Sequence, residues 1–164
     1  MINSTEHFIH YTAIIDSPLG HLGIKLEDNT LTAVDFLSKR TPLVNPTNSA
    51  AKQAVKELTS YFNGRSKSFS IPINYKTGTP FQHAVWQALS NIPYGKTITY
   101  GTLAKQLKTH ARAIGGACRN NRIPIIIPCH RVIGATHVGG YAGDTKGPLF
   151  SGKQWLLQHE SGNT

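Results

Sequence analysis

The hydrophobic positions of the first 76 residues follow two different periods. Apolar and β-branched residues gather in three short runs, at residues 11–15, 20–26 and 31–37. Turn residues separate these runs, with Asp16-Ser17-Pro18 after the first and Glu27-Asp28-Asn29 after the second. Short apolar runs bounded by turn residues predict an antiparallel meander of three strands.

From residue 49 to residue 62 the apolar residues recur every three or four positions, as Ala54, Leu58 and Tyr61 illustrate. This spacing predicts a helix that packs on the meander through its apolar face and ends at Gly64. Residues 65–76 are basic and mixed with Ser and Pro, so we expect a last strand that leads into a linker.

The second half of the chain opens with a helix-start signature. Thr79-Pro80-Phe81-Gln82 supplies an N-cap hydroxyl, a proline at the first helical position and a glutamine that completes a capping box. The Pro93-Tyr94-Gly95 segment should end this helix. Its apolar face is predicted to consist of Phe81, Val85, Trp86, Leu89 and Ile92.

Two shorter helices are predicted next, at residues 99–107 and 111–119, joined by a basic turn at residues 108–110. This is the outline of a helix-turn-helix. The second helix has few large side chains, and Gly115 and Gly116 each cost helix stability of about 1 kcal/mol. Such a bare helix suits close approach to a neighbouring helix or to a DNA groove. Arg112 at its start can reach past it into a minor groove.

The segment Ile125-Ile126-Ile127-Pro128-Cys129-His130-Arg131-Val132 joins an apolar run to polar residues. Proline favours extended backbone before it, so we expect a short buried strand or an extended leg that ends in a rigid corner at Cys129. A proton acceptor, His130, and a cation, Arg131, are neighbours that convert a thiol into a thiolate. Cys129 is therefore a candidate nucleophile. The alternative is that a free cysteine is a small buried hydrophobe, a description that fits Cys118 better.

Seventeen Lys and Arg residues against eight Asp and Glu give a formal net charge of +9. This charge favours polyanions, nucleic acid first, although a solubilising surface would carry it too. No apolar run is long enough to span a bilayer and no signal peptide is recognisable, so we expect no membrane association and a cytoplasmic or nuclear location. The two cysteines and the scattered histidines favour neither a disulfide scaffold nor a metal site.

Several blocks of the sequence together resemble the O6-alkylguanine-DNA alkyltransferases, also called methylated-DNA-protein-cysteine methyltransferases. Pro-Cys-His-Arg-Val at residues 128–132 resembles the active-site motif of that family. Further blocks resemble family blocks and follow the family order, at residues 81–86, 92–95, 99–104, 112–117 and 155–160. The resemblance covers the last half of the chain strongly and the first half loosely.

The resemblance implies an α+β fold. Residues 1–76 would form a small domain of antiparallel sheet plus helix, and residues 77–164 a winged helix-turn-helix domain that binds DNA and accepts an alkyl group. It implies a DNA repair protein that flips O6-alkylguanine out of double-stranded DNA, with O4-alkylthymine as a second candidate base. The alkyl group would move irreversibly and stoichiometrically to Cys129, in a single turnover. We expect a monomer with no cofactor and no metal.

The resemblance also implies residue roles. Cys129 is the nucleophile, His130 takes its proton through a water, and Glu160 orients His130. Asn121 braces the site, and Tyr100 gives a proton to the leaving purine. The base-binding set comprises Tyr141, the Ala142 amide, the carbonyls of Cys129 and Val132, Cys118 and Lys153. The DNA-binding set comprises Arg112, which fills the stack, Tyr100, which presses on the flanking phosphate, and Gly101, Ala113, Gly115, Gly116 and Arg119.

The sequence departs from the family pattern at several positions. The turn at residues 106–111 is two residues shorter than usual and lacks a Gly-x-Pro motif. Arg122 follows Asn121 where proline is usual. Asp144 stands where a second glycine is frequent, and Ala142 replaces a residue with a hydroxyl. We expect the shorter turn and Arg122 to alter the duplex contacts and Asp144 to alter the shape of the base pocket. Ala142 should matter little, because the base would use only its amide.

Three other functions compete with alkyl transfer. A non-enzymatic lesion sensor of alkyltransferase-like type would carry tryptophan at the position of Cys129. A winged-helix transcription factor would bind a specific duplex sequence without using Cys129. A cysteine hydrolase would need Cys129 and His130 to face each other, which adjacent residues rarely do.

Overall fold

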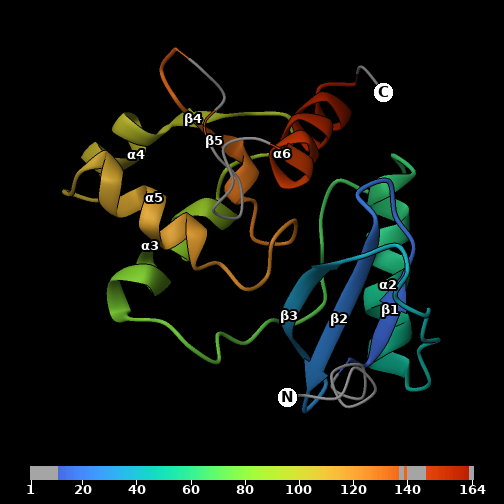
Figure 1. The fold of residues 1–164 in the computed structure, drawn as a ribbon. Coiled ribbons are helices and arrows are strands. Elements are labelled where there is room, and N and C mark those ends of the chain that lie inside the picture. The colour runs from blue at the N-terminus through green and yellow to red at the C-terminus, as the bar shows by residue number, and fades with distance from the viewer. Residues whose placement is uncertain (1–10, 137–138, 140–146, 163–164) are drawn as a thin grey trace. The chain divides into compact units, whose positions relative to one another are not determined.

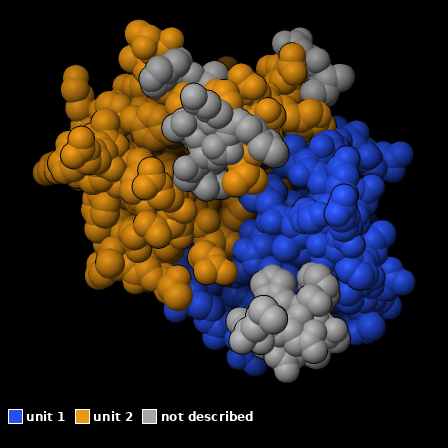
Figure 2. All heavy atoms as spheres, in the orientation of Figure 1, with its two compact units in different colours: residues 1–76 blue, residues 77–164 orange. Residues whose placement is uncertain are grey.

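The computed structural model describes residues 11–136, 139 and 147–162. The chain divides into two compact units, Met1–Lys76 and Thr77–Thr164, which are drawn as ribbons in Figure 1 and coloured separately in Figure 2. In the described ranges, no helix is both long and apolar enough to cross a membrane.

The first unit is built on a three-stranded antiparallel sheet in the order β1-β2-β3. The strands are β1 (Ala13–Ile15), β2 (His21–Glu27) and β3 (Thr30–Leu37), so the predicted meander is confirmed. Helix α2 (Ser49–Phe62) packs along the sheet (Figure 1). The core between them is apolar and fully buried, and includes Leu22, Ile24, Leu31, Ala54, Leu58 and Tyr61.

Both ends of α2 follow the sequence. The Asn48 side chain accepts a hydrogen bond from the Ala51 amide at 2.8 Å, which satisfies one free donor of the first turn. The chain leaves the helix through Gly64, whose φ of 74° is the left-handed geometry that glycine adopts most readily.

The strand expected within residues 65–76 is wrong. This segment makes only an isolated parallel bridge, between Ile73 and Leu31. Its backbone amides at Ser70 and Ile71 donate instead to the carboxylate of Glu57 on α2, at 2.7 and 3.1 Å. Donors that bind a side chain in this way are not available to a strand ladder.

In the second unit, α3 (Pro80–Ser90) begins with the predicted capping box at Thr79 and Gln82. Val85, Trp86 and Leu89 are buried as expected. Phe81 is 39% exposed, so its assignment to the apolar face is wrong; it lies in the first turn, before the helix is covered. The indole Nε1 of Trp86 donates to the Ala117 carbonyl at 2.8 Å and so ties α3 to α5.

Helices α4 (Tyr100–Gln106) and α5 (Ala111–Arg119) pack on each other and form the predicted helix-turn-helix (Figure 1). The shortened turn between them places Lys108 at a φ of 57°. The amide of the next residue, Thr109, donates to the Ala104 carbonyl at 2.9 Å. His110 then caps α5, because its Nδ1 atom accepts a hydrogen bond from the Ala113 amide at 3.3 Å.

The strand expected at residues 125–127 is also wrong. Ile125 has a φ of 75°, and the chain turns there through a bridge between Pro124 and Ile127. Ile125 and Ile127 are nevertheless fully buried, so the apolar run fills the core as a turn instead of a strand. A β-branched residue with positive φ is rare, which is why the sequence did not predict it.

The chain after this turn forms the one-turn 3₁₀ helix η1 (Cys129–Arg131) and the strand β5 (Val132–Ile133). Strand β5 pairs in parallel with β4 (Ile98–Thr99), just before α4. Helix α6 (Gly147–Glu160) closes the unit and packs against η1.

Candidate active site

Cys129 is the first residue of η1 and directly follows Pro128. Its amide donates to the Ile127 carbonyl at 2.8 Å, and the Arg131 amide donates to the Pro128 carbonyl at 3.0 Å. The residue is 5% exposed. The cysteine is therefore held on a rigid corner, as predicted.

Burial raises the pKa of the Cys129 thiol above its ordinary value. Two neighbours act in the opposite direction, namely a hydrogen bond from Asn121 and the positive charge of Lys153. The groups expected from the sequence to ionise the thiol were its chain neighbours His130 and Arg131. That expectation is wrong for Arg131, because Glu160 binds its guanidinium.

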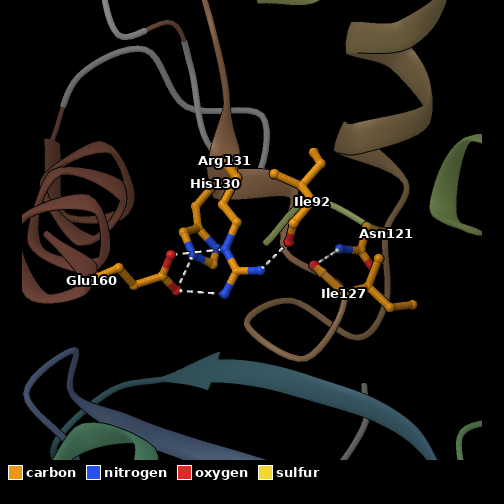
Figure 3. Close-up of polar contacts among 6 residues, drawn as sticks. All are labelled: Ile92, Asn121, Ile127, His130, Arg131 and Glu160. Atoms are coloured by element: carbon orange, nitrogen blue, oxygen red, sulfur yellow. Dashed lines mark hydrogen bonds and ion pairs between the residues drawn. The ribbon is translucent and has the colours of Figure 1, made fainter. Parts of the chain in front are cut away.

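His130, Arg131 and Glu160 form a buried ion cluster (Figure 3). The Nε2 atom of His130 lies 2.7 Å from Oε2 of Glu160. The guanidinium of Arg131 donates to the same carboxylate from Nε at 2.8 Å and from Nη2 at 3.0 Å. A carboxylate can accept several such bonds at once, so one acid on α6 holds two consecutive residues of η1.

The Glu160 contact sets the tautomer of His130. A carboxylate only accepts, so Nε2 carries the hydrogen and Nδ1 has a free lone pair when the ring is neutral. Burial lowers the pKa of His130 below its ordinary value of 6.5, with Glu160 acting in the opposite direction. Within the described residues, the buried Nδ1 atom has no hydrogen-bond partner. The ring is thus a neutral base with one unused acceptor.

Arg131 has further contacts that fix its side chain. Its Nη1 donates to the Ile92 carbonyl at 2.6 Å, and its guanidinium carbon lies 5.7 Å from the centroid of the Tyr94 ring. The residue is buried, so this arginine joins the loop after α3 to η1 and α6. Its role is structural.

Asn121 joins two segments of the site (Figure 3). Its side-chain Nδ2 donates to the Ile127 carbonyl at 2.9 Å, and its Oδ1 accepts from the Ile123 amide at 2.9 Å. The same side chain hydrogen-bonds the Cys129 thiol. Asn121 thus links the segment after α5 to the segment just before Cys129.

Among the described residues, Lys153 supplies a positive charge that acts on the Cys129 thiol. The residue is fully buried on α6, and its Nζ donates to the Val132 carbonyl at 2.7 Å and to the Tyr100 hydroxyl at 3.4 Å. Burial lowers its pKa to about 8, while the thiols of Cys129 and Cys118 act to raise it. A Cβ atom added at Gly139 would lie 3.0 Å from the Tyr100 ring and 3.5 Å from this ammonium, so a side chain there would crowd both groups.

Tyr100 is the first residue of α4, and Thr99 before it caps the helix. Burial raises the pKa of Tyr100 to about 12, and the two thiols add to this effect. The hydroxyl therefore keeps its proton at neutral pH and can donate it.

The two carbonyls predicted to bind a base each already accept one hydrogen bond. The Cys129 carbonyl accepts from the Val132 amide, and the Val132 carbonyl accepts from Lys153. Each retains a second lone pair. Tyr141 and Ala142, predicted to form the rest of the base pocket, lie outside the described residues, as does Asp144.

The predicted DNA-binding residues lie on α4 and α5. Arg112 and Arg119 are exposed, and a Cβ atom added at Gly101, Gly115 or Gly116 would meet nothing within 4 Å. These glycines therefore form part of an open surface, and packing of another helix of this unit does not account for them. The surrounding unit is strongly basic, because residues 77–164 hold nine of the Lys and Arg residues but only two of the acids.

Sequence reasoning missed the structural use of Arg131 and the position of Lys153 as the cation beside the thiol. A signal for Lys153 was present, because it lies three residues before Leu156 and seven before Glu160, on the spacing of one helix face. All three are buried. The pairing of Arg131 with a residue 29 positions away has no local signal.

Two family models match the chain. The model described as 6-O-methylguanine DNA methyltransferase, DNA binding domain, matches residues 80–162, and that described as 6-O-methylguanine DNA methyltransferase, ribonuclease-like domain, matches residues 9–75. The constitutive methylated-DNA–protein-cysteine methyltransferase of Bacillus subtilis is 38% identical over 149 residues, which cover 82% of this chain and 88% of that protein. A methylated-DNA–protein-cysteine methyltransferase of Mycobacterium tuberculosis is 42% identical over 143 residues, covering 82% of this chain and 85% of that protein.

Solved structures give the same picture. The O6-methylguanine methyltransferase of Mycobacterium tuberculosis superposes with a TM-score of 0.77 at 38% identity, over 92% of both chains. A structure from the same organism in complex with DNA has a TM-score of 0.78 at 38% identity, again over 92% of both chains. An O6-methylguanine DNA methyltransferase from Methanococcus jannaschii has a TM-score of 0.68 at 33% identity, over 92% of this chain and 94% of that one.

Proposed function

The chain belongs to the 6-O-methylguanine DNA methyltransferase family, and on this premise we propose that it repairs O6-alkylguanine through the residues described above. It is a DNA repair protein that transfers an alkyl group from DNA to its own cysteine. The acceptor is Cys129. The observation that carries this assignment is the position of one buried thiol, on a proline-fixed corner, between a donor amide and a buried ammonium.

The first step is ionisation of the Cys129 thiol. The free Nδ1 lone pair of His130 is the group that takes the proton, through a water, while Glu160 holds Nε2. The resulting thiolate is stabilised by the hydrogen bond from Asn121 and by the charge of Lys153. Because burial otherwise disfavours the anion, these two groups determine how much thiolate is present.

The thiolate then attacks the alkyl carbon, a C–S bond forms, and the bond from carbon to the purine oxygen breaks. The electron pair stays on the guanine, which takes the Tyr100 hydroxyl proton. Lys153, whose Nζ lies 3.4 Å from that hydroxyl, replaces the proton. Neutral guanine and a neutral thioether result, and the thioether has no reverse reaction, so each chain reacts once.

The target atom lies inside the duplex, so the nucleotide must first be flipped out, which costs a few kcal/mol of unstacking. The basic charge of residues 77–164 and the open glycine surface of α4 and α5 support DNA binding through this face. Arg112, exposed at the start of α5, would fill the gap in the stack. Tyr100 at the start of α4 would press on the flanking phosphate.

The finer assignments belong to the same proposal. O6-alkylguanine in duplex DNA is the preferred substrate, with O4-alkylthymine as a second base. The protein acts as a monomer without a cofactor. A substrate in genomic DNA is consistent with the cytoplasmic or nuclear location expected from the sequence.

The competing functions fit the site less well. A lesion sensor that lacks a nucleophile does not account for Cys129. A transcription factor has no use for the ammonium and phenol beside the thiol. A cysteine hydrolase would need the Nδ1 atom of His130 to hydrogen-bond the Cys129 thiol directly while Nε2 binds Glu160. The contact of Nε2 with Glu160 is present, but Nδ1 makes no hydrogen bond to the thiol.

A turnover titration tests the proposal. The full chain is mixed with increasing amounts of duplex that carries O6-methylguanine. The amount of duplex in which the lesion has been converted to guanine is then measured. Repair should stop at one lesion for each chain, whatever the excess of DNA. An unmethylated duplex serves as the control. Continued turnover, or binding of the lesion without repair, would contradict the proposal.

A further inference from the structure

The turn between α4 and α5 holds a lysine in a backbone conformation that suits glycine. Lys108 has a φ of 57°, in the left-handed region where the Cβ atom of an L-residue comes too close to the backbone. The Lys108 amide donates to the Lys105 carbonyl at 3.2 Å. The next amide, that of Thr109, donates to the Ala104 carbonyl at 2.9 Å, so the turn is fixed on both sides. A glycine would adopt the same turn without the steric cost, and the fold alone therefore does not explain the lysine.

The side chain of Lys108 is available to a ligand. It is exposed, and among the described residues its ammonium has no hydrogen-bond or ion-pair partner. Residues other than glycine that are held in the left-handed region cluster at functional sites, where the use of the residue compensates for the strain. What this lysine offers to a ligand is one positive charge at a fixed position of the turn.

His110 gives the same turn a second donor. The residue is exposed, and its Nδ1 atom accepts a hydrogen bond from the Ala113 amide at 3.3 Å, which caps α5. A neutral imidazole that accepts through Nδ1 carries its hydrogen on Nε2. The cap therefore fixes both the place of the ring and the atom that can donate. Lys108 and His110 precede Arg112 by four and two positions.

The charge pattern around the turn indicates which ligand it binds. Residues 58–143 contain no Asp or Glu, although they hold ten of the seventeen Lys and Arg residues of the chain. Lys105 on α4 and Arg112 and Arg119 on α5 are exposed cations of this stretch. A long stretch with cations and no acids favours a polyanion. Lysine ammonium groups and side-chain N–H donors are groups that bind the phosphate oxygens of DNA.

We propose that the turn at residues 108–110 binds the phosphate backbone of the duplex, Lys108 through its charge and His110 through its Nε2 hydrogen. This contact fixes the start of α5 on the duplex, from which Arg112 reaches the stack. The inference rests on the proposed binding of DNA through α4 and α5. The strain at Lys108 is then a cost borne by the free protein, and the phosphate contact is what the lysine gains in the complex.

The salt dependence of duplex binding tests the role of Lys108. Fluorescence anisotropy of a labelled duplex without a lesion gives the affinity of the full chain at a series of KCl concentrations. Lys108→Gly should bind several-fold more weakly at low salt. Its slope of log affinity against log salt should be shallower by about 0.9, the value for one phosphate contact. Lys108→Arg keeps the charge at the same position and should match the unmodified chain in affinity and slope.

Two controls separate the phosphate contact from other effects of the glycine. Lys52→Gln removes an equal charge from the exposed side of α2 and should leave the slope unchanged. Urea denaturation should show that Lys108→Gly is no less stable than the unmodified chain, because glycine suits this backbone. A weaker complex formed by a protein that is at least as stable cannot be the result of unfolding.

His110→Asn is the matched variant for the second donor. Asparagine is a good N-cap residue, so the start of α5 should be preserved while the Nε2 donor is lost. Binding should weaken several-fold with no change in the salt slope, because the group removed is neutral. Affinity equal to that of the unmodified chain would contradict the contact made by His110.

The outcomes for Lys108 are equally distinct. Equal slopes in Lys108→Gly and the unmodified chain, or an equal loss of affinity in Lys108→Arg and Lys108→Gly, would overturn the proposal. If either occurred in a chain that repairs one lesion per molecule, the proposed function would stand. Because the duplex carries no lesion, the expected slopes in a chain that transfers no alkyl group would reject the proposed function and leave the phosphate contact standing. A chain that binds no duplex would reject both.

Discussion

The Nε2 atom of His130 lies 2.7 Å from Oε2 of Glu160, although the two residues are 30 positions apart in the chain. Both side chains are buried, and the same carboxylate receives two hydrogen bonds from Arg131. One acid at the end of α6 therefore fixes both residues that follow Cys129. It fixes the tautomer of the neutral His130 ring and neutralises the guanidinium of Arg131 beside it.

Replacing Glu160 with Gln should weaken the fold as well as the chemistry. The substitution leaves the buried guanidinium of Arg131 without its counter-charge, and breaking a buried pair in this way costs about 3–5 kcal/mol. Urea denaturation measures this loss of unfolding free energy. The control is Glu27→Gln, which removes only an exposed ion pair with Lys76 at 3.9 Å and should change stability by less than about 1 kcal/mol. Equal effects of the two substitutions would show that the buried cluster contributes nothing special.

The pH dependence of repair should reveal the charge of Lys153. Below the raised pKa of the Cys129 thiol, the fraction of thiolate increases about tenfold with each pH unit. Above the pKa of Lys153, which is about 8, the fraction of charged Lys153 falls by the same factor with each pH unit. The product of the two fractions therefore rises up to about pH 8 and then levels. Single-turnover rates between pH 6.5 and pH 9.5 measure this profile.

Lys153→Met is the matched variant, since it keeps the apolar stem and removes the charge. Its rate should be about 10²-fold lower at neutral pH, within the range for loss of one catalytic group. It should also continue to rise through pH 9 with no levelling. A variant that keeps the levelling near pH 8 would assign the profile to another group.

The turn between α4 and α5 should be easy to stabilise. Lys108 has a φ of 57°, a region in which a side chain costs about 1–2 kcal/mol relative to glycine. Lys108→Gly should therefore raise the unfolding free energy by about 1 kcal/mol. The same change at Lys105, within the last turn of α4, should lower it by about 1 kcal/mol. Urea denaturation of both variants gives the two signs, and destabilisation by Lys108→Gly would show that this lysine makes a compensating contact.

Arg112 should matter only when the base has to leave a duplex. Arg112→Ala should slow repair of a methylated duplex by about 10–10²-fold, because the gap in the stack costs a few kcal/mol when it is not filled. Transfer from the free base O6-benzylguanine should not change. Arg65→Ala, an exposed arginine of the first unit, is the control and should leave both rates nearly unaltered. If Arg112→Ala also lost transfer from the free base, the substitution would be disturbing the site around Cys129, and the arginine would not act by stabilising the flipped nucleotide.

Local patterns in the sequence predicted those elements whose signals are local. The meander, the capping box at Thr79 and the limits of α5 depend on turn residues, caps and period, and the structure contains them. The apolar run before Cys129 was read wrongly as a strand. Ile125 adopts a positive φ there, and the burial of its side chain in the core outweighs its preference for extended backbone.

The sequence was a better guide to which residues belong to the candidate site than to the contacts between them. The resemblance to a known family supplied Glu160, Asn121 and Lys153, but the sequence assigned the role of the nearby cation to Arg131. Glu160 binds the Arg131 guanidinium only because the fold brings the two residues together from 29 positions apart. A pattern read along the chain does not contain that information.

The identity of the acceptor is the central claim, and peptide mass tests it most directly. The full chain is allowed to react with a duplex that contains O6-methylguanine, then digested, with Cys129→Ala treated in parallel. The account predicts one methyl group for each chain, on the peptide that contains Cys129, and none on the variant. A methyl group on Cys118, or a chain that binds the lesion and remains unmodified, would contradict it.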